Sequence, residues 1–176
     1  GAVCRGVGTA MRDPLAFDAH SQIGVPDMCE AWSSGELAVA NWPGVGVAQA
    51  RAFSAFMPRL AKVLLGESLI LPNMATWWCG QAEERNYVRD HLDDLVVSPA
   101  FGGTVAGLAG GRTRAGASLD ASERADLFAA MEARPIDYVG QEIVHLSTTP
   151  ALVGDTFEPR PFTLRAFVAR GADGEW

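Results

Sequence analysis

The chain has 176 residues, a formal net charge of −7, 48% hydrophobic residues and 20% charged residues. This length suffices for one domain or two small lobes with a real core. An acidic chain without a basic run argues against nucleic-acid binding, because phosphate neutralisation supplies most of that affinity.

Neither a membrane nor a secretory segment is visible in the sequence. No apolar run approaches the ~20 residues that cross a bilayer, and the N-terminus lacks the basic and apolar regions of a signal peptide. The three cysteines, Cys4, Cys29 and Cys79, are widely spaced and form no CxxC motif. We therefore expect a cytoplasmic protein without a disulfide framework.

Both ends of the chain suggest a longer protein. The first residue is Gly1 rather than methionine, and Trp176 follows a glycine-rich turn at 171–174, where a returning strand would begin. We expect the chain to be a fragment.

The first half of the chain is predicted to be mainly helical. A helix is expected at 26–33, a short strand at 36–41 and apolar residues at helical spacing over 48–65. Pro58 falls inside this last stretch and predicts a kink or two meeting helices, because proline removes a backbone hydrogen bond. A second short strand is expected at 68–71.

The second half alternates strands and helices. Strands are expected at 95–97, 138–144 and 162–169, and helices at 81–92 and 118–134. Asp120 and Glu123 have the spacing of a capping box at the start of the second helix. The intervening stretch 100–116 holds six glycines and predicts a flexible hairpin or lid.

The strand at 95–97 runs into glycines, which suggests a phosphate site. Ser98, Gly102 and Gly103 follow this strand, and glycines there let backbone N–H groups approach phosphate oxygens. The glycine spacing matches no strict motif, so a plain mobile hairpin remains the alternative.

Two further groups of side chains could contact a nucleotide. Gln141 and Glu142 end a predicted strand and can present backbone groups to an adenine edge, although their spacing alone favours a sheet edge with two solvated side chains. Arg160 and Arg165 belong to the last predicted strand. A cation on an internal strand face needs a carboxylate or a bound phosphate.

Six stretches in order resemble the circularly permuted ATP-grasp type 2 family, including its glutathionylspermidine synthase-like branch. They are RDPLAFDAHSQIGVPDMCEA, ELAVANWPGVGV, FMPRLAKVLLGESLILPNMATWWCG, AEERNYVRDHLDDLVVSPAF, DYVGQEIVHLSTTP and EPRPFTLRAFV. The resemblance implies an α+β, ATP-grasp-like fold, here incomplete, with a nucleotide cleft between mixed or antiparallel sheets of two small lobes. We place these lobes at 1–92 and 93–176.

The resemblance also implies an activity. Members look like ATP-dependent ligases that join a small-molecule or peptide carboxylate to an amine through an acyl phosphate, with ATP and Mg²⁺. Gln141 and Glu142 fall where the family holds adenine and ribose. Arg165 and Arg160 lie on or before its arginine-bearing strand, Arg165 as the catalytic candidate at the phosphate or acyl phosphate. A candidate substrate or nucleotide loop contains Asn41, Gly44 and Gly46.

One departure from the family pattern stands at Ser98. The family's strand usually reads VVKP or VIKP, with the lysine on phosphate, and here it reads VVSP. A charged hydrogen bond contributes roughly 1.5–3 kcal/mol, so its loss costs about ten- to a hundredfold in ATP affinity. Arg112 or Arg114 could compensate, and we expect the metal ligands outside this chain. The alternatives are a catalytically inactive ATP-grasp-like binding or interaction module and a purely structural module.

Overall fold

The computed structural model describes residues 13, 15, 25–38, 45–168, 171, 173 and 174. Contacts divide the chain into two units, Gly1–Glu142 and Ile143–Trp176, and each is described by itself. The lobe boundary expected after residue 92 falls inside the first unit, where strands on both sides of it pair in one sheet.

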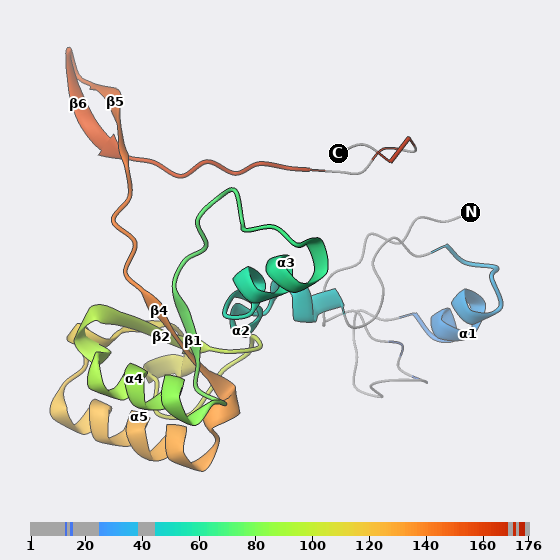
Figure 1. Cartoon of the computed structure of the whole chain (residues 1–176), viewed down its shortest axis with the longest axis horizontal. Helices are drawn as coiled ribbons and strands as arrows, with labels where there is room; N and C mark the ends of the chain where they lie inside the picture. The colour runs from blue at the N-terminus through green and yellow to red at the C-terminus, as the bar shows by residue number, and fades with distance from the viewer. Residues whose placement is uncertain are drawn as a thin grey trace. The chain divides into compact units, whose positions relative to one another are not determined.

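The first unit is built on a four-stranded antiparallel sheet in the order β1-β4-β2-β3 (Figure 1). Its strands are β1 (Thr76–Trp78), β2 (Leu95–Pro99), β3 (Arg114–Ala115) and β4 (Tyr138–Glu142). The α-helices are α1 (Met28–Ser33), α2 (Arg51–Ser54), α3 (Met57–Leu65), α4 (Ala82–Asp90) and α5 (Ala121–Ala133). Short 3₁₀ helices are η2 (Val45–Gln49), η3 (Leu92–Asp94), η4 (Ala109–Gly111), η5 (Gly116–Ser118) and η6 (Pro135–Asp137). This mixed α+β architecture with antiparallel pairing confirms the expected fold class.

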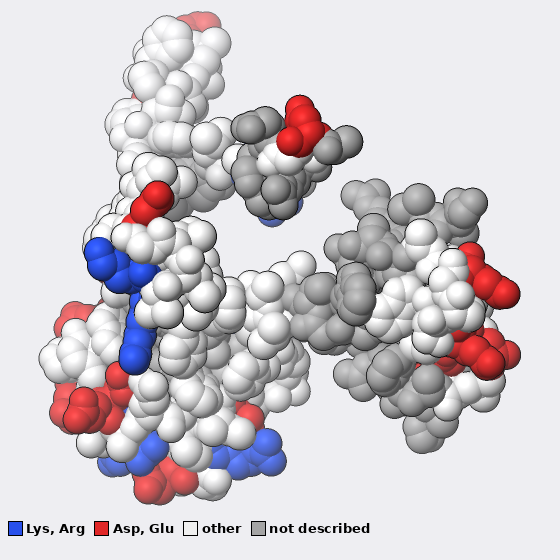
Figure 2. All heavy atoms as spheres, turned by 45° about the vertical axis from the view of Figure 1, so that its right-hand side comes forward, with Lys and Arg blue, Asp and Glu red and all other residues white. Residues whose placement is uncertain are grey.

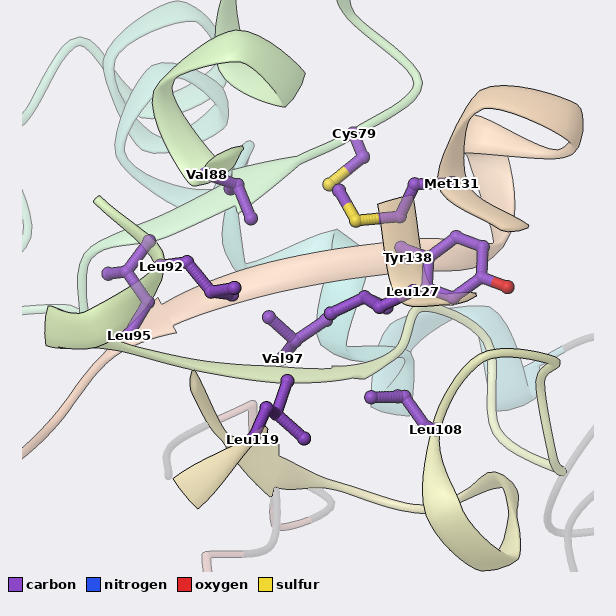
Figure 3. Packing of buried hydrophobic residues seen from close by; sticks show 10 residues of the cluster. All are labelled: Cys79, Val88, Leu92, Leu95, Val97, Leu108, Leu119, Leu127, Met131 and Tyr138. Atoms are coloured by element: carbon purple, nitrogen blue, oxygen red, sulfur yellow. The ribbon is translucent and has the colours of Figure 1, made fainter. Parts of the chain in front are cut away.

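One face of this sheet packs against α4 and α5 (Figure 3). Val97 of β2 and Tyr138 of β4 meet Val88 of α4 and Leu127 of α5, and all are buried. Fully burying such a side chain stabilises the fold by about 1.5–3 kcal/mol. This face is therefore occupied by a packed apolar core.

The opposite face has a smaller apolar cluster and a thinner cover. Ala52 of α2 packs there with Ala100 and Val139, and Trp78 lies against them. The Ala52 N–H donates to the Ala100 carbonyl at 3.1 Å, which fixes α2 at the end of β2.

Local signals explain several helix ends. The Asp120 side chain accepts from the Glu123 N–H and the Glu123 side chain accepts from the Asp120 N–H, which confirms the capping box of α5. Two helices, α2 and α3, replace a single helix over 48–65, and Pro58 lies in the first turn of α3. This outcome confirms the interpretation of Pro58, because a helix tolerates proline in its first turn.

Three predicted strands differ from the structure. Residues 68–71 and 162–168 are not strands, and neither are 36–38; residues 39–41 and 169 lie outside the described part. The strand that precedes α4 is instead β1, which pairs with β4. Apolar runs at 68–71 and 162–168 stay exposed, so no burial favours a strand there.

The second unit contains one hairpin. Strands β5 (Thr148–Val153) and β6 (Thr156–Pro161) pair antiparallel, from Thr148 opposite Pro161 to Val153 opposite Thr156. Gly154 in the two-residue loop has φ 60°, as the tight turns of hairpins require. None of the helices described in either unit combines the length and the apolar character that a membrane-spanning segment needs.

We expect Gly140→Ala to lower the free energy of unfolding by about 1–3 kcal/mol, as overpacking does in a filled core. A Cβ at Gly140 would lie 2.5 Å from Val88 Cγ2. Urea denaturation of this variant, of Val88→Ala and of the double variant measures the effect. Because the shortened Val88 side chain makes room, the double variant should lose less than the two single losses together. Strictly additive losses would contradict the predicted contact.

Candidate functional site

Ser98 is buried, and its hydroxyl group pairs with the hydroxyl group of Thr113. It is 1% exposed on β2, and its Oγ lies 2.9 Å from Thr113 Oγ1, just before β3. Ser98 sits opposite Val139 and therefore on the sheet face that α2 partly covers. The position at which the resemblance led us to expect lysine is thus filled by a satisfied hydroxyl.

A hollow of about 320 Å³ lies beside this hydroxyl pair. Arg51 of α2, Pro99 at the end of β2, Gly103, Arg112 and Thr113 line it. Among the described residues, no carboxylate lines the hollow, and its charged groups are two guanidinium groups. This donor set suits an anion and does not suit a divalent cation.

The glycine-rich segment is only partly a loop. Gly102 and Gly103 have φ of 85° and 81°, and a Cβ added to either would meet nothing within 4 Å. Beyond them Leu108 enters the core, and the Tyr138 hydroxyl donates to the Ala106 carbonyl at 2.9 Å. The flanking strands β2 and β3 pair antiparallel, so the stretch does connect a hairpin. It is not the flexible hairpin or lid that we expected, because after the two glycines it packs on the sheet and α5.

Gln141 and Glu142 end β4, which neighbours β2. The Gln141 Nε2 donates to Thr76 Oγ1 at 3.2 Å, and the Ala75 N–H donates to the Glu142 carboxylate at 2.7 Å. Gln141 shares a sheet face with Val139 and hence with Ser98, whereas Glu142 alternates to the other face.

The structure brings Gln141 and the hollow to the same side of the sheet. Thr113, which lines the hollow, is bonded to Ser98, and Ser98 lies on the face of Gln141. The hollow also reaches Pro99 at the end of β2, which pairs with Tyr138, three residues before Gln141 along β4. At 3.4 Å per residue the separation along the strand is roughly 10 Å. This is comparable to the distance between the base and the phosphates of an extended nucleotide.

Arg160 and Arg165 belong to the second unit. Arg160 lies on β6 and donates to Glu158 Oε2 at 2.7 Å, with both side chains about half exposed. Arg165 is exposed and lies outside any strand, so the prediction of an internal strand face is wrong. An exposed guanidinium is solvated and needs no counter-charge, which removes the burial argument for a phosphate there.

Of the three residues in the expected substrate or nucleotide loop, the structure describes one. Asn41 and Gly44 lie outside the described residues, and Gly46 is half-buried in η2 just before α2. The loop stays a prediction.

Cys79 is unsuited to nucleophilic chemistry. It is fully buried in the core under α4, and burial raises the pKa of its thiol to about 12. Among the described residues, no three histidine, cysteine, aspartate or glutamate side chains gather into a set that could hold a metal ion.

Sequence reasoning missed Arg51 and Thr113. Arg51 precedes Ala52 at the start of α2, and only the contact of Ala52 with Ala100 brings it to the hollow. Arg51 is far from β2 in the sequence, so no local pattern indicated that the two would meet. Thr113 could have been found as the hydroxyl paired with Ser98 only if the β2–β3 register had been known.

Comparison with known proteins identifies the family. The whole chain, residues 1–176, matches the family model described as circularly permuted ATP-grasp type 2.

The chain belongs to this family.

Curated relatives are longer than the chain. An uncharacterized protein of Synechocystis sp. (strain ATCC 27184 / PCC 6803 / Kazusa) is 36% identical over 161 residues, which make up 92% of this chain and 32% of that protein. An uncharacterized protein of Mycobacterium leprae (strain TN) is 31% identical over 176 residues, 99% of this chain and 30% of that protein. A Frankia alni protein named "Putative glutamate--cysteine ligase 2-3" is 32% identical over 148 residues, 84% of this chain and 17% of that protein. The chain spans about a third or less of these relatives' lengths.

We expect Cys79 to resist thiol reagents in the folded protein. With a pKa of about 12, about one thiol in ten thousand is ionised at pH 8, and the thiolate is the reactive form. Iodoacetamide labelling followed by peptide mass spectrometry should leave Cys79 unmodified until urea unfolds the chain. Cys79 labelling in the native protein as fast as in urea would contradict its burial.

Proposed function

We propose that this chain supplies the nucleotide-binding part of an ATP-dependent carboxylate–amine ligase. Its membership in the ATP-grasp family supports the reaction class, and the name of the Frankia relative describes a ligase of two amino acids. The matched segment is only 17% of that relative. The proposed substrates are therefore a small-molecule or peptide carboxylate and an amine, without closer identification.

The proposed reaction has two balanced steps. A carboxylate oxygen attacks the γ-phosphorus of ATP, the bond to the β–γ bridging oxygen breaks, and ADP leaves. The amine nitrogen then attacks the acyl carbon, the bond from that carbon to the phosphate oxygen breaks, and phosphate leaves while the amine loses a proton. The protein's contribution to such chemistry is mainly positioning and charge stabilisation.

The observation that carries the proposal is the shared sheet face of Gln141 and the basic hollow. Gln141 offers an amide to the base, and Gly103, Arg112 and Thr113 line the hollow at the phosphate end. The other face is closed by α4 and α5. On the face of Gln141, Val139 and Ser98 are themselves buried. We therefore place the nucleotide along the rim of this face, where it would meet hydrogen-bonding groups at both ends.

Several site roles rest on the family motif alone. We retain Arg165 as the group that contacts the phosphate or acyl phosphate, with Arg160 nearby in sequence. Asn41, Gly44 and Gly46 stay candidates for a substrate or nucleotide loop. Mg²⁺, when bound, would spread charge on the transferring phosphoryl group, and its ligands are proposed outside the residues described here.

A second candidate function is an inactive ATP-grasp-like binding module. Ser98 favours it, because the Ser98 and Thr113 hydroxyls satisfy each other and β2 contributes no cation of its own. Hydroxylamine separates the two functions, since it intercepts acyl phosphates. ADP release with hydroxamate formation from a panel of carboxylates would favour the ligase. ATP binding without either product would favour the binding module.

We expect the chain to bind ATP, and Gln141→Ala to weaken this binding about fivefold, as the loss of one hydrogen bond does. Isothermal titration calorimetry measures both affinities. The matched control is Gln81→Ala, which removes the same side chain at the start of α4 and should leave ATP affinity unchanged. No ATP binding at millimolar concentration would contradict the proposed function.

A further inference from the structure

We propose that Arg51 and Arg112 bind the polyphosphate of the nucleotide in the hollow, taking the role of the lysine that Ser98 replaces. This inference rests on the proposed function and names the residues that hold the phosphates. It differs from the family pattern, since one cation comes from α2 and the other from the segment before β3.

Charge pairing distinguishes Arg51 and Arg112 from most other arginines. Most described arginines meet carboxylates: Arg85 and Arg89 with Glu132, Arg114 with Glu123, Arg124 with Asp93, Arg134 with Asp137, and Arg160 with Glu158. Within the described residues, four arginines have no such partner: Arg51, Arg59, Arg112 and Arg165. Two of these four line one hollow.

Two unpaired arginines at one hollow are unexpected in an acidic chain. The chain carries 21 acidic against 14 basic residues, and charges of both signs are interspersed on the face that Figure 2 presents. Acidic side chains are therefore plentiful, yet none of those that the structure describes lines the hollow. Two guanidinium groups without a carboxylate attract an anion, and each can bind phosphate with two parallel hydrogen bonds.

The backbones of Arg51 and Arg112 are held in place, while their side chains reach solvent. Arg51 stands between the buried Ala50 and Ala52, and the Ala52 N–H donates to the Ala100 carbonyl. Arg51 itself is exposed. Its guanidinium group therefore extends from a fixed point at the end of β2.

Arg112 is held in a comparable way. Its neighbour Gly111 is buried with φ 66°, and a Cβ there would lie 2.3 Å from Thr104 Cβ. On the other side, Thr113 Oγ1 is bonded to Ser98 Oγ. Ser98 thus acts as a positioning residue for Arg112, and a fixed backbone lowers the entropy cost of binding.

The backbone of the glycine loop, Gly102 and Gly103, offers N–H donors beside the hollow. The N–H groups of Gly102 and Gly103 make no hydrogen bond within the described residues. Gly103 lines the hollow, and both glycines have positive φ. Successive N–H groups in such turns form concave anion sites.

Arg114 does not share this role. It pairs with Val97 across β2 and β3, so it lies on the face that packs against the helices, and it forms an ion pair with Glu123 of α5 at 3.7 Å. Of the two arginines considered as replacements for the missing lysine, the hollow favours Arg112.

The test is calorimetric binding of inorganic tripolyphosphate and of ATP to the 176-residue chain. Arg112→Ala and Arg51→Ala should each weaken binding of both ligands about tenfold or more, as the loss of a charge-assisted hydrogen bond does. Arg112→Lys should retain part of the affinity because it keeps the charge. Thermal unfolding curves that match the unsubstituted protein establish that each variant folds.

Two arginine variants serve as matched controls. Arg59→Ala removes an unpaired arginine of α3 that does not line the hollow, and Arg114→Ala removes one that is paired with Glu123 on the other face of the sheet. Both should leave tripolyphosphate affinity within about twofold, because neither guanidinium group contacts the proposed anion. Equal losses in all four alanine variants would mean a general charge effect and would overturn the proposal. So would unchanged binding in Arg112→Ala and Arg51→Ala, or no tripolyphosphate binding at all.

The outcomes separate this inference from the proposed function. ATP affinity that is unchanged in Arg51→Ala and Arg112→Ala but weakened in Gln141→Ala would support the nucleotide function and overturn the phosphate assignment. Tripolyphosphate binding that depends on both arginines, with no competition by ATP, would support the anion site and contradict the nucleotide function.

Discussion

The arrangement of the candidate site depends on the antiparallel pairing of β4 with β2. Five residue pairs, from Leu95 with Glu142 to Pro99 with Tyr138, set which side chains share a face. A shift by one residue would exchange the faces. This register sends Val97 and Tyr138 into the helical core and places Ser98 and Gln141 on the opposite side. Gly140 is part of the same constraint, because its missing side chain lets Val88 of α4 approach the strand.

The two faces of the sheet thereby acquire different roles. Helices α4 and α5 close one face with apolar contacts, while α2 covers only part of the other. On this second face the cations do not come from the central strands. They are contributed by elements attached to the end of β2, where the Ala52–Ala100 and Ser98–Thr113 hydrogen bonds hold them. In the proposed site, positive charge therefore comes from these elements and not from the position of Ser98.

Local signals predicted part of this structure. Asp120 and Glu123 revealed the start of α5, and Pro58 revealed the break between α2 and α3. The β-branched run predicted the strand β2. Each of these features depends on near neighbours in the sequence. By contrast, β1 is held by β4, about sixty residues away, and the apolar run at 162–168 has no burial that would make it a strand. Arg51 was missed for the same reason: only tertiary packing brings it to the glycine loop. The family resemblance pointed to Ser98 and Gln141, and the register then showed that they share a face.

Amide hydrogen exchange with and without ATP tests the central claim most directly, because it locates a ligand without any substitution. The account predicts slower exchange on ATP addition at the Gly102–Gly103 loop, at Arg112 and at the end of β4 near Gln141. Exchange in α4 and α5, on the closed face, should not change. Protection confined to the α4 and α5 face, or no protection anywhere at saturating ATP, would contradict it.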